Sequence, residues 1–404
     1  MTLGVLIGRL NHLRHVEGAI RAARADGHRV VLWCHTPTTR STKDYERPVP
    51  ARLPQRIFGM ASVESVESLA SLRVECAHEG VAALLSTIDL PAPLVTGLSA
   101  GATVAWLPPT VSDFMQAREP WKWAAIFSWS AVWSRIATWH REALGEFREA
   151  LVLRHALPVG YPPAECLDAI EARDARATLG VATPRVVVLL PYPFDITPWA
   201  WATHVRYAHL ARWNDRAVVR SLRAFCDRWD AALVVKERAK NAVRGYARDA
   251  ADHVIEGDEP GEPTLLRLLS FAHLLVHFSS SSTLDAVAAG VRQYTFTLPG
   301  DTRLTGGWRA HEDFKAGRGL FHAWHGVARH LPVHYVRHGL DDTYPFREAT
   351  WAQNTHVDPL IRRYYAERYL GGWPVPKSGA LIVDELVRRV ERSAAPRARI
   401  EAAA

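Results

Sequence analysis

The chain has 404 residues, of which 48% are hydrophobic and 23% are charged, and its formal net charge is +7. This length predicts two domains, and the composition excludes a disordered or fibrous protein. The basic residues are scattered without a long run, which argues against nucleic acid, whereas the mild positive excess suits an anionic substrate or an anionic membrane surface.

Cysteine spacing and hydropathy exclude further classes of protein. The four cysteines form no C-x-x-C pair, so neither a zinc site nor a small disulfide framework is predicted. The apolar run at the N-terminus is too short for a signal peptide, and no apolar stretch reaches the length of a membrane-spanning helix. We therefore expect a cytoplasmic protein, and leave open a peripheral contact with the cytoplasmic face of the inner membrane.

Strand and helix patterns alternate in the first part of the chain. Residues 3–7 form a short apolar strand, residues 15–25 carry apolar side chains at helical spacing, and residues 30–34 form a second strand. Parallel neighbours need a crossover helix between them, so this unit opens a parallel sheet. Further strands are predicted at 82–86, 103–107, 124–127 and 150–154, and further helices at 63–79 and 130–149.

A second run of strands and helices follows the proline-rich segment 157–163 and a helix over 164–179. Its strands are predicted at 186–191, 231–235, 253–256, 274–278 and 291–297, and its helices at 216–229, 264–271 and 284–289. Residues 300–355 receive no assignment, and the tail 394–404 is expected to be disordered. Doubly wound α/β halves of this kind bind ligands at the carboxyl ends of their strands.

The hydroxyl-rich stretch 279–283 lies between a predicted buried strand and a helix that ends at Gly290. Free N–H groups at a helix start, the helix dipole and side-chain hydroxyls all favour a phosphate group. The spacing of Ser282 and Asp285 also fits a capping box, and one helix start can serve both purposes. We predict that a nucleotide diphosphate contacts Ser280, Ser281, Ser282 and Thr283.

Four stretches together resemble the GT-B glycosyltransferase superfamily. They are the opening unit 3–34, the crossover PVGYPP at 158–163, the strand that ends in Lys236, and SSSSTLDAVAAGV at 279–291. The nearest likeness is to bacterial capsule and surface-polysaccharide transferases. The CDP-glycerol glycerophosphotransferases and the UDP-N-acetylglucosamine 2-epimerases look like structural cousins.

The chain also departs from the pattern of these relatives. Glu237-Arg238 stands where many members have His-Pro, and Asp285 stands where glutamate is common. Neither a G-x-G-x-x-G motif nor a P-loop occurs, which disfavours a simple dehydrogenase or a P-loop NTPase. The departures keep open a protein that retains the fold but has lost the chemistry.

The resemblance implies two Rossmann-like β/α domains that face each other across a cleft, as in the GT-B fold. We expect an N-terminal domain on the acceptor side, a linker with the crossover helix, a C-terminal nucleotide-binding domain, a C-terminal helix and a disordered tail. Their expected ranges are 1–160, 161–184, 185–375, 376–393 and 394–404.

GT-B enzymes, as the resemblance implies, bind the nucleotide mainly on the C-terminal half and need no metal held by a D-x-D motif. We therefore expect no cofactor and no metal, only a nucleotide-sugar co-substrate. Lys236 and Arg238 lie just past a strand end, where two cations could reach a diphosphate, although both could also be plain surface charges. Asp285 could accept hydrogen bonds from ribose hydroxyls or could simply cap its helix.

An inverting transferase needs a base that deprotonates the acceptor hydroxyl. His12 lies in the loop after the first strand, and imidazole has a suitable pKa. The chain has 19 histidines, so a single one is weak evidence. Asp113 and Asp195, in loops after other strands, are rival candidates for the catalytic base, and Asn11 could orient the acceptor.

Five tryptophans crowd residues 121–139, at positions 121, 123, 129, 133 and 139. Core packing is the better interpretation, with sugar stacking or contact with a membrane interface as the alternatives. For the membrane alternative, Lys122, Arg135 and Arg141 would suit anionic headgroups. Several histidines also crowd residues 322–338, but neither cysteine nor regular ligand spacing supports a metal site there.

The leading hypothesis is a glycosyltransferase that moves a sugar from a nucleotide-sugar donor to a glycan or lipid-linked acceptor in cell-surface polysaccharide synthesis. The alternatives are a nucleotide-sugar epimerase or a CDP-alcohol phosphotransferase on the same scaffold. A catalytically inactive scaffold protein is the remaining alternative. No nucleic-acid partner is expected.

Overall fold

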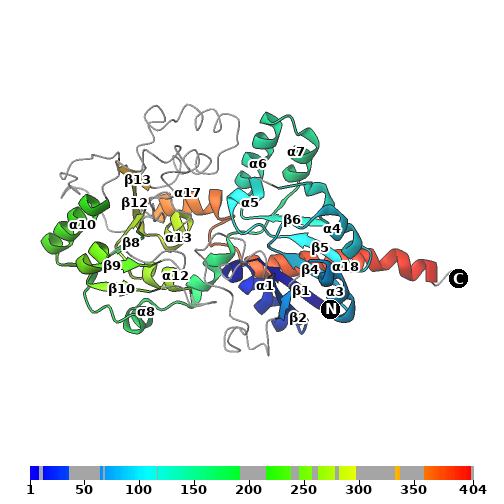
Figure 1. The fold of residues 1–404 in the computed structure, drawn as a ribbon, viewed down its shortest axis with the longest axis horizontal. Helices are drawn as coiled ribbons and strands as arrows, with labels where there is room; N and C mark the ends of the chain where they lie inside the picture. Colours follow the sequence, from blue (N-terminus) through cyan, green and yellow to red (C-terminus); the bar gives the residue numbers. More distant parts are fainter. Residues whose placement is uncertain are drawn as a thin grey trace. The chain divides into compact units, whose positions relative to one another are not determined.

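A computed structural model describes residues 1–8, 12–35, 64–66, 69–115, 117–191, 215–237, 245–256, 263–277, 282–296, 333–336 and 359–401. The chain divides into two compact units (Figure 1). Unit 1 contains Met1–Glu165 and Glu367–Ala404, and unit 2 contains Cys166–Glu259 and Pro263–Ala366. The expected domain ranges differ from this division at residues 367–375, which belong to unit 1.

Unit 1 is built on a parallel sheet of seven strands in the order β3-β2-β1-β4-β5-β6-β7. The first strand lies between β2 and β4, with Val5 opposite Leu32 on one side and Leu85 on the other. The strands are β1 Thr2–Ile7, β2 Arg29–His35, β3 Glu64–Val66, β4 Ala83–Ser86, β5 Thr103–Trp106, β6 Ala125–Ser128 and β7 Leu157–Pro158. The helices are α1 Leu13–Ala25, α3 Leu69–His78, α4 Ala92–Ser99, α5 Val111–Met115, α6 Ala131–Ala143, α7 Phe147–Arg154 and α18 Ser378–Glu401, with short 3-10 turns η3 Pro120–Lys122 and η4 Pro162–Ala169.

Helix α18 lies far from α1 in sequence but packs beside it in the core of unit 1. Ile382, Val383 and Leu386 join the same buried cluster as Val16 and Ile20 of α1. The approach is very close at one point, since a Cβ atom on Gly379 would overlap the carbonyl group of Gly18. Only glycine allows this contact.

The start of α18 is held by a half-buried carboxylate. Glu165 accepts a hydrogen bond from the backbone N–H of Gly379. Burial raises the pKa of the Glu165 carboxyl, against hydrogen bonds from Gly379 and Ser378 that lower it. The helix then continues to Glu401, so residues 394–401 are helical and not disordered as expected.

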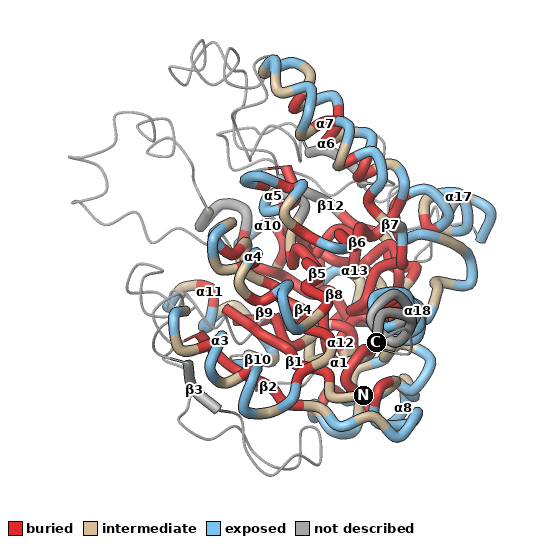
Figure 2. Tube along the Cα trace, turned by 90° about the vertical axis from the view of Figure 1, so that its right-hand side faces the viewer, coloured by how far each residue is buried: buried red, intermediate tan, exposed pale blue. Residues whose placement is uncertain are grey.

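Unit 2 is built on a second parallel sheet, of six strands in the order β10-β9-β8-β11-β12-β13. Its strands are β8 Arg185–Leu189, β9 Ala231–Lys236, β10 His253–Ile255, β11 Leu274–His277, β12 Arg292–Phe296 and β13 Val333–Val336. Its helices are α8 Ala172–Thr178, α10 Asp215–Trp229, α11 Gly245–Ala250, α12 Thr264–Leu269 and α13 Ser282–Ala289, and α17 Pro359–Tyr369 follows. Figure 2 shows the central strands of both sheets as buried along their length.

Both faces of the second sheet are covered, which explains its unbroken apolar strands. Val187 and Leu189 pack with α10 and α11 on one face. Val186 and Val188 point to the other face and pack with α12 and α13. The alternation along a single strand therefore fixes which helices lie on which side.

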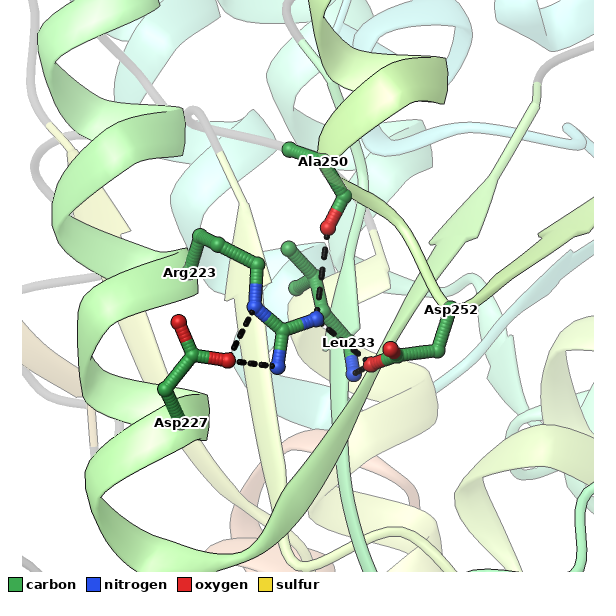
Figure 3. A network of polar contacts seen from close by, with 5 residues as sticks. All are labelled: Arg223, Asp227, Leu233, Ala250 and Asp252. Carbon is green, nitrogen blue, oxygen red and sulfur yellow. Dashed lines mark hydrogen bonds and ion pairs between the residues drawn. The ribbon is translucent and has the colours of Figure 1, made fainter.

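A polar network ties α10 to the neighbouring strands (Figure 3). Arg223 bonds Asp227 on its own helix and Asp252 just before β10, at 2.7 Å and 2.6 Å. Asp252 also accepts the backbone N–H of Leu233 at 2.7 Å. Partial burial raises the pKa of Asp252, but the hydrogen bonds from Arg223 and Leu233 outweigh it and hold that pKa below its usual range.

The predicted fold class, two Rossmann-like β/α domains, is confirmed. Three assignments within unit 1 are wrong. Residues 150–154 belong to helix α7, with Ala150 and Leu153 as its buried side, and the strand that follows is the two-residue β7. The long helix expected at 130–149 is divided because Gly145 adopts a left-handed conformation with φ of +78°.

The N-terminal part of the helix predicted over 63–79 is also wrong. Residues Glu64–Val66 form the edge strand β3, which pairs with β2, and helix α3 begins only at Leu69. The sequence ESV is too short for its period to separate a strand from a helix.

Candidate active site

Buried polar groups lie at the carboxyl ends of strands in unit 2. Lys236 is the last residue of β9 and is 2% exposed, and its Nζ donates a hydrogen bond to the carbonyl oxygen of Glu237 at 2.7 Å. Glu237 is also buried, and Arg248 of α11 reaches its carboxylate at 3.3 Å. The glutamate at the His-Pro position is therefore part of an ion pair that ties β9 to α11.

Three buried side chains connect β11, β12 and the first turn of α13. The Nε2 amide of Gln293 donates to the backbone oxygen of Thr283 at 3.2 Å, so its Oε1 faces His277 Nε2 at 3.0 Å. An amide oxygen only accepts, so Nε2 of His277 carries the proton. The Oγ1 atom of Thr283 lies 3.3 Å from the same nitrogen. This network fixes the position at which α13 begins.

Several predicted nucleotide contacts fall on this helix start. Ser282, Thr283 and Asp285 all lie in the first turn of α13 and are at most 9% exposed. The backbone N–H groups of a first helical turn have no partner within the helix, and the dipole there favours negative charge. The geometry can therefore stabilise a phosphate, while the predicted contact of Asp285 with a ribose stays a prediction.

Four of the predicted site residues lie outside the part of the chain that the structure describes. They are Asp195, Arg238, Ser280 and Ser281. Asn11, the residue expected to orient the acceptor, lies outside it as well.

In unit 1, His12 lies beside the carboxyl ends of β1 and β4, immediately before α1. Its Nδ1 atom lies 2.9 Å from Oγ1 of Thr87. The Thr87 hydroxyl donates its single proton to the Leu6 carbonyl at 3.2 Å and accepts the Gly8 N–H at 3.3 Å. With the Thr87 proton directed at Leu6, Nδ1 of His12 is the donor to Thr87 Oγ1. In a neutral imidazole this tautomer places the accepting lone pair on Nε2, where a general base needs it.

A buried aromatic layer supports the same edge of the sheet. His15 stacks on Trp129 with ring centroids 5.8 Å apart, and Tyr161 meets Trp129 edge-on at 5.0 Å. Burial lowers the pKa of His15 well below its usual range, with smaller contributions from the charges of Arg14 and His12. His15 is therefore neutral. The guanidinium group of Arg14 donates a hydrogen bond to the Tyr161 hydroxyl at 3.2 Å, and its positive charge contributes to the lowered pKa of His15.

Asp113, one of the rival bases, lies in the short helix α5 and not in a loop. Thr110 Oγ1 donates to its carboxylate at 2.6 Å, and the Asp113 N–H donates back to Thr110 Oγ1 at 3.1 Å. This reciprocal pair is a capping arrangement. The geometry therefore gives Asp113 a structural role and makes His12 the better candidate base.

The core interpretation of the tryptophan cluster is confirmed for three of its members. Trp123, Trp129 and Trp133 are buried, and Trp133 donates its indole N–H to the Tyr369 carbonyl at 2.9 Å. The remaining two, Trp121 and Trp139, are exposed.

The membrane alternative invoked three basic residues near these tryptophans, and the side chains of two of them are buried in ion pairs. Lys122 is buried in an ion pair with Asp89 at 2.8 Å. Arg141 is buried against Glu146 and the Ala117 carbonyl. Arg135 alone of the three is exposed on its helix.

The sequence analysis did not single out Thr87 and Gln293, which form hydrogen bonds with His12 and His277. Thr87 directly follows a buried strand, so its position at a strand end was available as a signal. Gln293 has no comparable local signal, because its role depends on the pairing of β11 with β12.

Two further searches cover the described residues. Among them no group of three or more His, Cys, Asp or Glu side chains is placed to hold a metal ion. None of the helices in the described ranges has the length and apolar character needed to span a bilayer.

No protein-family profile matches the sequence, and no characterised protein sequence matches it either. Solved structures with a similar fold do exist. The UDP-GlcNAc 2-epimerase from Neisseria meningitidis bound to UDP-GlcNAc superposes with a TM-score of 0.55 at 10% identity, covering 96% of this chain and all 100% of that one. The UDP-GlcNAc 2-epimerase from Methanocaldococcus jannaschii gives 0.51 at 12% identity, with 96% and 100% covered.

The wall teichoic acid polymerase TagF is also similar, with a TM-score of 0.52 at 14% identity, covering 97% of this chain and 90% of that one. Identities this low establish the fold alone. This chain therefore has the GT-B fold of two Rossmann-like domains, as its resemblance to that superfamily implies.

Proposed function

We propose that this protein is a glycosyltransferase that moves a sugar from a nucleotide-sugar donor to a hydroxyl group of a glycan or lipid-linked acceptor. The observation that carries the proposal is the His12–Thr87 pair, in which the hydrogen bond from Nδ1 orients the imidazole ring at a strand end of unit 1. The fold supports it, because a protein of similar fold, the Neisseria meningitidis epimerase, binds the nucleotide sugar UDP-GlcNAc.

In this proposal the acceptor hydroxyl gives its proton to Nε2 of His12 as its oxygen forms a bond to the anomeric carbon of the donor. The bond between that carbon and the nucleotide phosphate breaks, and the nucleotide leaves with the electron pair. The start of α13 and the ammonium group of Lys236 stabilise the developing negative charge. No residue of this scheme uses a metal ion, and the nucleotide sugar is a co-substrate.

A nucleotide-sugar epimerase is the second candidate, because two of the structures that superpose above a TM-score of 0.5 are UDP-GlcNAc 2-epimerases. An epimerase needs no acceptor. Turnover of UDP-, GDP-, CDP-, CMP- and dTDP-linked donors, each with and without a mixture of glycan acceptors, distinguishes the two activities. We expect acceptor-dependent release of nucleotide from one donor, whereas conversion of the donor without acceptor would favour the epimerase.

The nucleotide site is tested separately by the double variant Ser281→Ala with Ser282→Ala. We expect weaker nucleotide binding with an unchanged circular dichroism spectrum. Unchanged affinity would mean that the helix start is only capped by these hydroxyls. No nucleotide binding at millimolar concentration would overturn every catalytic version and leave the inactive scaffold.

A further inference from the structure

Exposed apolar side chains gather on the helical hairpin formed by α6 and α7 in unit 1. Trp139 is 64% exposed, Phe147 is 69% exposed and Leu151 is 56% exposed. The hydroxyl of Thr138 reaches the Ala150 carbonyl at 3.4 Å, so the neighbours of Trp139 and Leu151 are in contact across the hairpin. We call these three side chains the hairpin patch. Such a concentration of large apolar groups marks an interaction surface.

The hairpin patch is extended by Trp121, which precedes it in the chain. Arg148 follows Phe147 in sequence, and its guanidinium group lies 4.6 Å from the centre of the Trp121 ring. Tryptophan and arginine side chains of this kind combine an apolar body with a polar end, which suits the boundary between headgroups and acyl chains.

The charges around the hairpin patch favour one kind of partner. All the exposed charged residues of α6 and α7 are arginines, at positions 135, 148 and 154. The three glutamates of the hairpin are less exposed, and Glu142 and Glu146 are paired with Arg154 and Arg141. The hairpin carries four arginines against three glutamates, so its exposed surface is apolar with a slight excess of positive charge, which suits an anionic lipid surface.

Helix α6 shows how the sequence builds this surface. Ala131, Arg135 and Trp139 recur at intervals of four and are exposed, while Trp133 and Ala137 on the opposite side are buried. The exposed stripe of α7 likewise alternates between apolar and basic residues, and Figure 2 shows the exposed sides of both helices. An amphipathic pair whose outer side is aromatic and basic lies in a membrane interface with its apolar groups inserted.

We propose that the α6–α7 hairpin docks unit 1 onto an anionic lipid bilayer. Trp139, Phe147 and Leu151 insert among the upper acyl chains, and Arg135 and Arg148 bind lipid phosphates. The docking is peripheral and reversible, since two or three inserted side chains give far less binding energy than a spanning helix. It is independent of the catalytic proposal, because binding to lipid needs no turnover.

The experiment is sedimentation of the full chain with vesicles made of equal parts of phosphatidylglycerol and phosphatidylcholine, compared with vesicles of phosphatidylcholine alone. We expect binding to the anionic vesicles that falls as salt is raised. The variant Trp139→Ser with Phe147→Ser and Leu151→Ser should weaken binding about tenfold or more. The variant Arg135→Gln with Arg148→Gln should weaken it by about fivefold for each charge removed.

A matched control comes from helix α3 of the same unit, where Arg73 and Val74 are also exposed. The variant Arg73→Gln with Val74→Ser should bind vesicles as the wild-type protein does. Circular dichroism of each variant confirms that the fold is retained. Absence of binding to anionic vesicles, or equal losses in the hairpin and control variants, would overturn the proposal.

Sedimentation velocity of the same proteins without lipid tests whether the hairpin patch binds a second copy of this chain instead. Self-association that the apolar hairpin variant abolishes, together with no vesicle binding, would make the hairpin patch a contact between copies of this chain. That result would also overturn the proposal.

Discussion

The strand ends of the two units use buried polar groups in different ways. In unit 1, the Thr87 hydroxyl accepts a hydrogen bond from Nδ1 of His12 and so orients a single ring. In unit 2, His277 and Gln293 hold the backbone of a helix start, so the arrangement positions N–H groups and a dipole. The comparison teaches that two related folds place different polar arrangements at their strand ends, and the proposed function assigns proton transfer to the first and anion binding to the second.

The largest expected effect is on the chemistry assigned to unit 1. His12→Ala removes the base, so kcat should fall by between about a hundredfold and about ten-thousandfold. Nucleotide affinity should be unchanged, because the nucleotide site is assigned to unit 2. Steady-state kinetics with the donor identified by the panel provides the measurement.

Thr87→Val is the control for the His12 variant, because it keeps the ring but removes the acceptor of its Nδ1 proton. We expect a smaller fall in kcat than for His12→Ala and an altered pH profile. If Thr87→Val leaves kcat and its pH dependence unchanged, the tautomer argument is wrong.

A smaller effect, on nucleotide affinity, is expected when the positive charge of Lys236 in unit 2 is removed. Lys236→Met keeps the apolar stem and removes the ammonium group, so the affinity for the nucleotide should fall by about tenfold to a hundredfold, the range of a charge-assisted hydrogen bond. Isothermal titration with the nucleotide measures this loss. A variant with wild-type affinity would show that Lys236 only binds its neighbour's carbonyl oxygen.

The buried network below α13 gives an effect on stability. Gln293→Leu leaves His277 Nε2–H and the Thr283 carbonyl without these partners, so the free energy of unfolding should fall by about 1–3 kcal/mol. Nucleotide affinity should fall with it, because the helix start is no longer fixed. Urea denaturation and titration of the same sample test both results, and a loss of stability without any loss of affinity would separate the network from the binding site.

The smallest effect concerns the Arg223–Asp252 network. The pKa of Asp252 is lowered in the folded protein, so its contribution to stability is present above the pKa of the unfolded chain and is lost as pH falls through the folded value. Because both side chains are partly exposed, we expect this contribution to be below about 1 kcal/mol. Urea midpoints of the wild-type protein and Asp252→Asn should differ at neutral pH and converge in acid, and a constant difference would contradict the assignment.

The sequence predicts the central strands well, since the apolar runs at 3–7 and 186–191 contain the buried residues of β1 and of β8 Arg185–Leu189. It does not predict which remote segments complete them. Helix α18 joins unit 1 through the contact of Gly379 with Gly18, a pairing between positions more than three hundred residues apart that leaves no local pattern.

The candidate site shows the same division between local and remote signals. His12, Lys236 and Thr283 follow from their places at strand ends and a helix start, which are local features. Thr87 also lies at a strand end, but its role, like that of Gln293, is recognised only from hydrogen bonds to remote residues. Asp113 has the correct chemistry and a suitable position in the sequence, yet its carboxylate is bonded to a neighbouring threonine.

The central claim is that unit 2 binds the nucleotide and that His12 of unit 1 performs the proton transfer. One calorimetric titration series tests it most directly, with the donor nucleotide added in turn to the wild-type protein, to His12→Ala and to Lys236→Met. We predict equal affinity for the first two and a clear loss for the third. No binding to the wild-type protein at millimolar concentration, or a loss at His12→Ala with none at Lys236→Met, would contradict the claim.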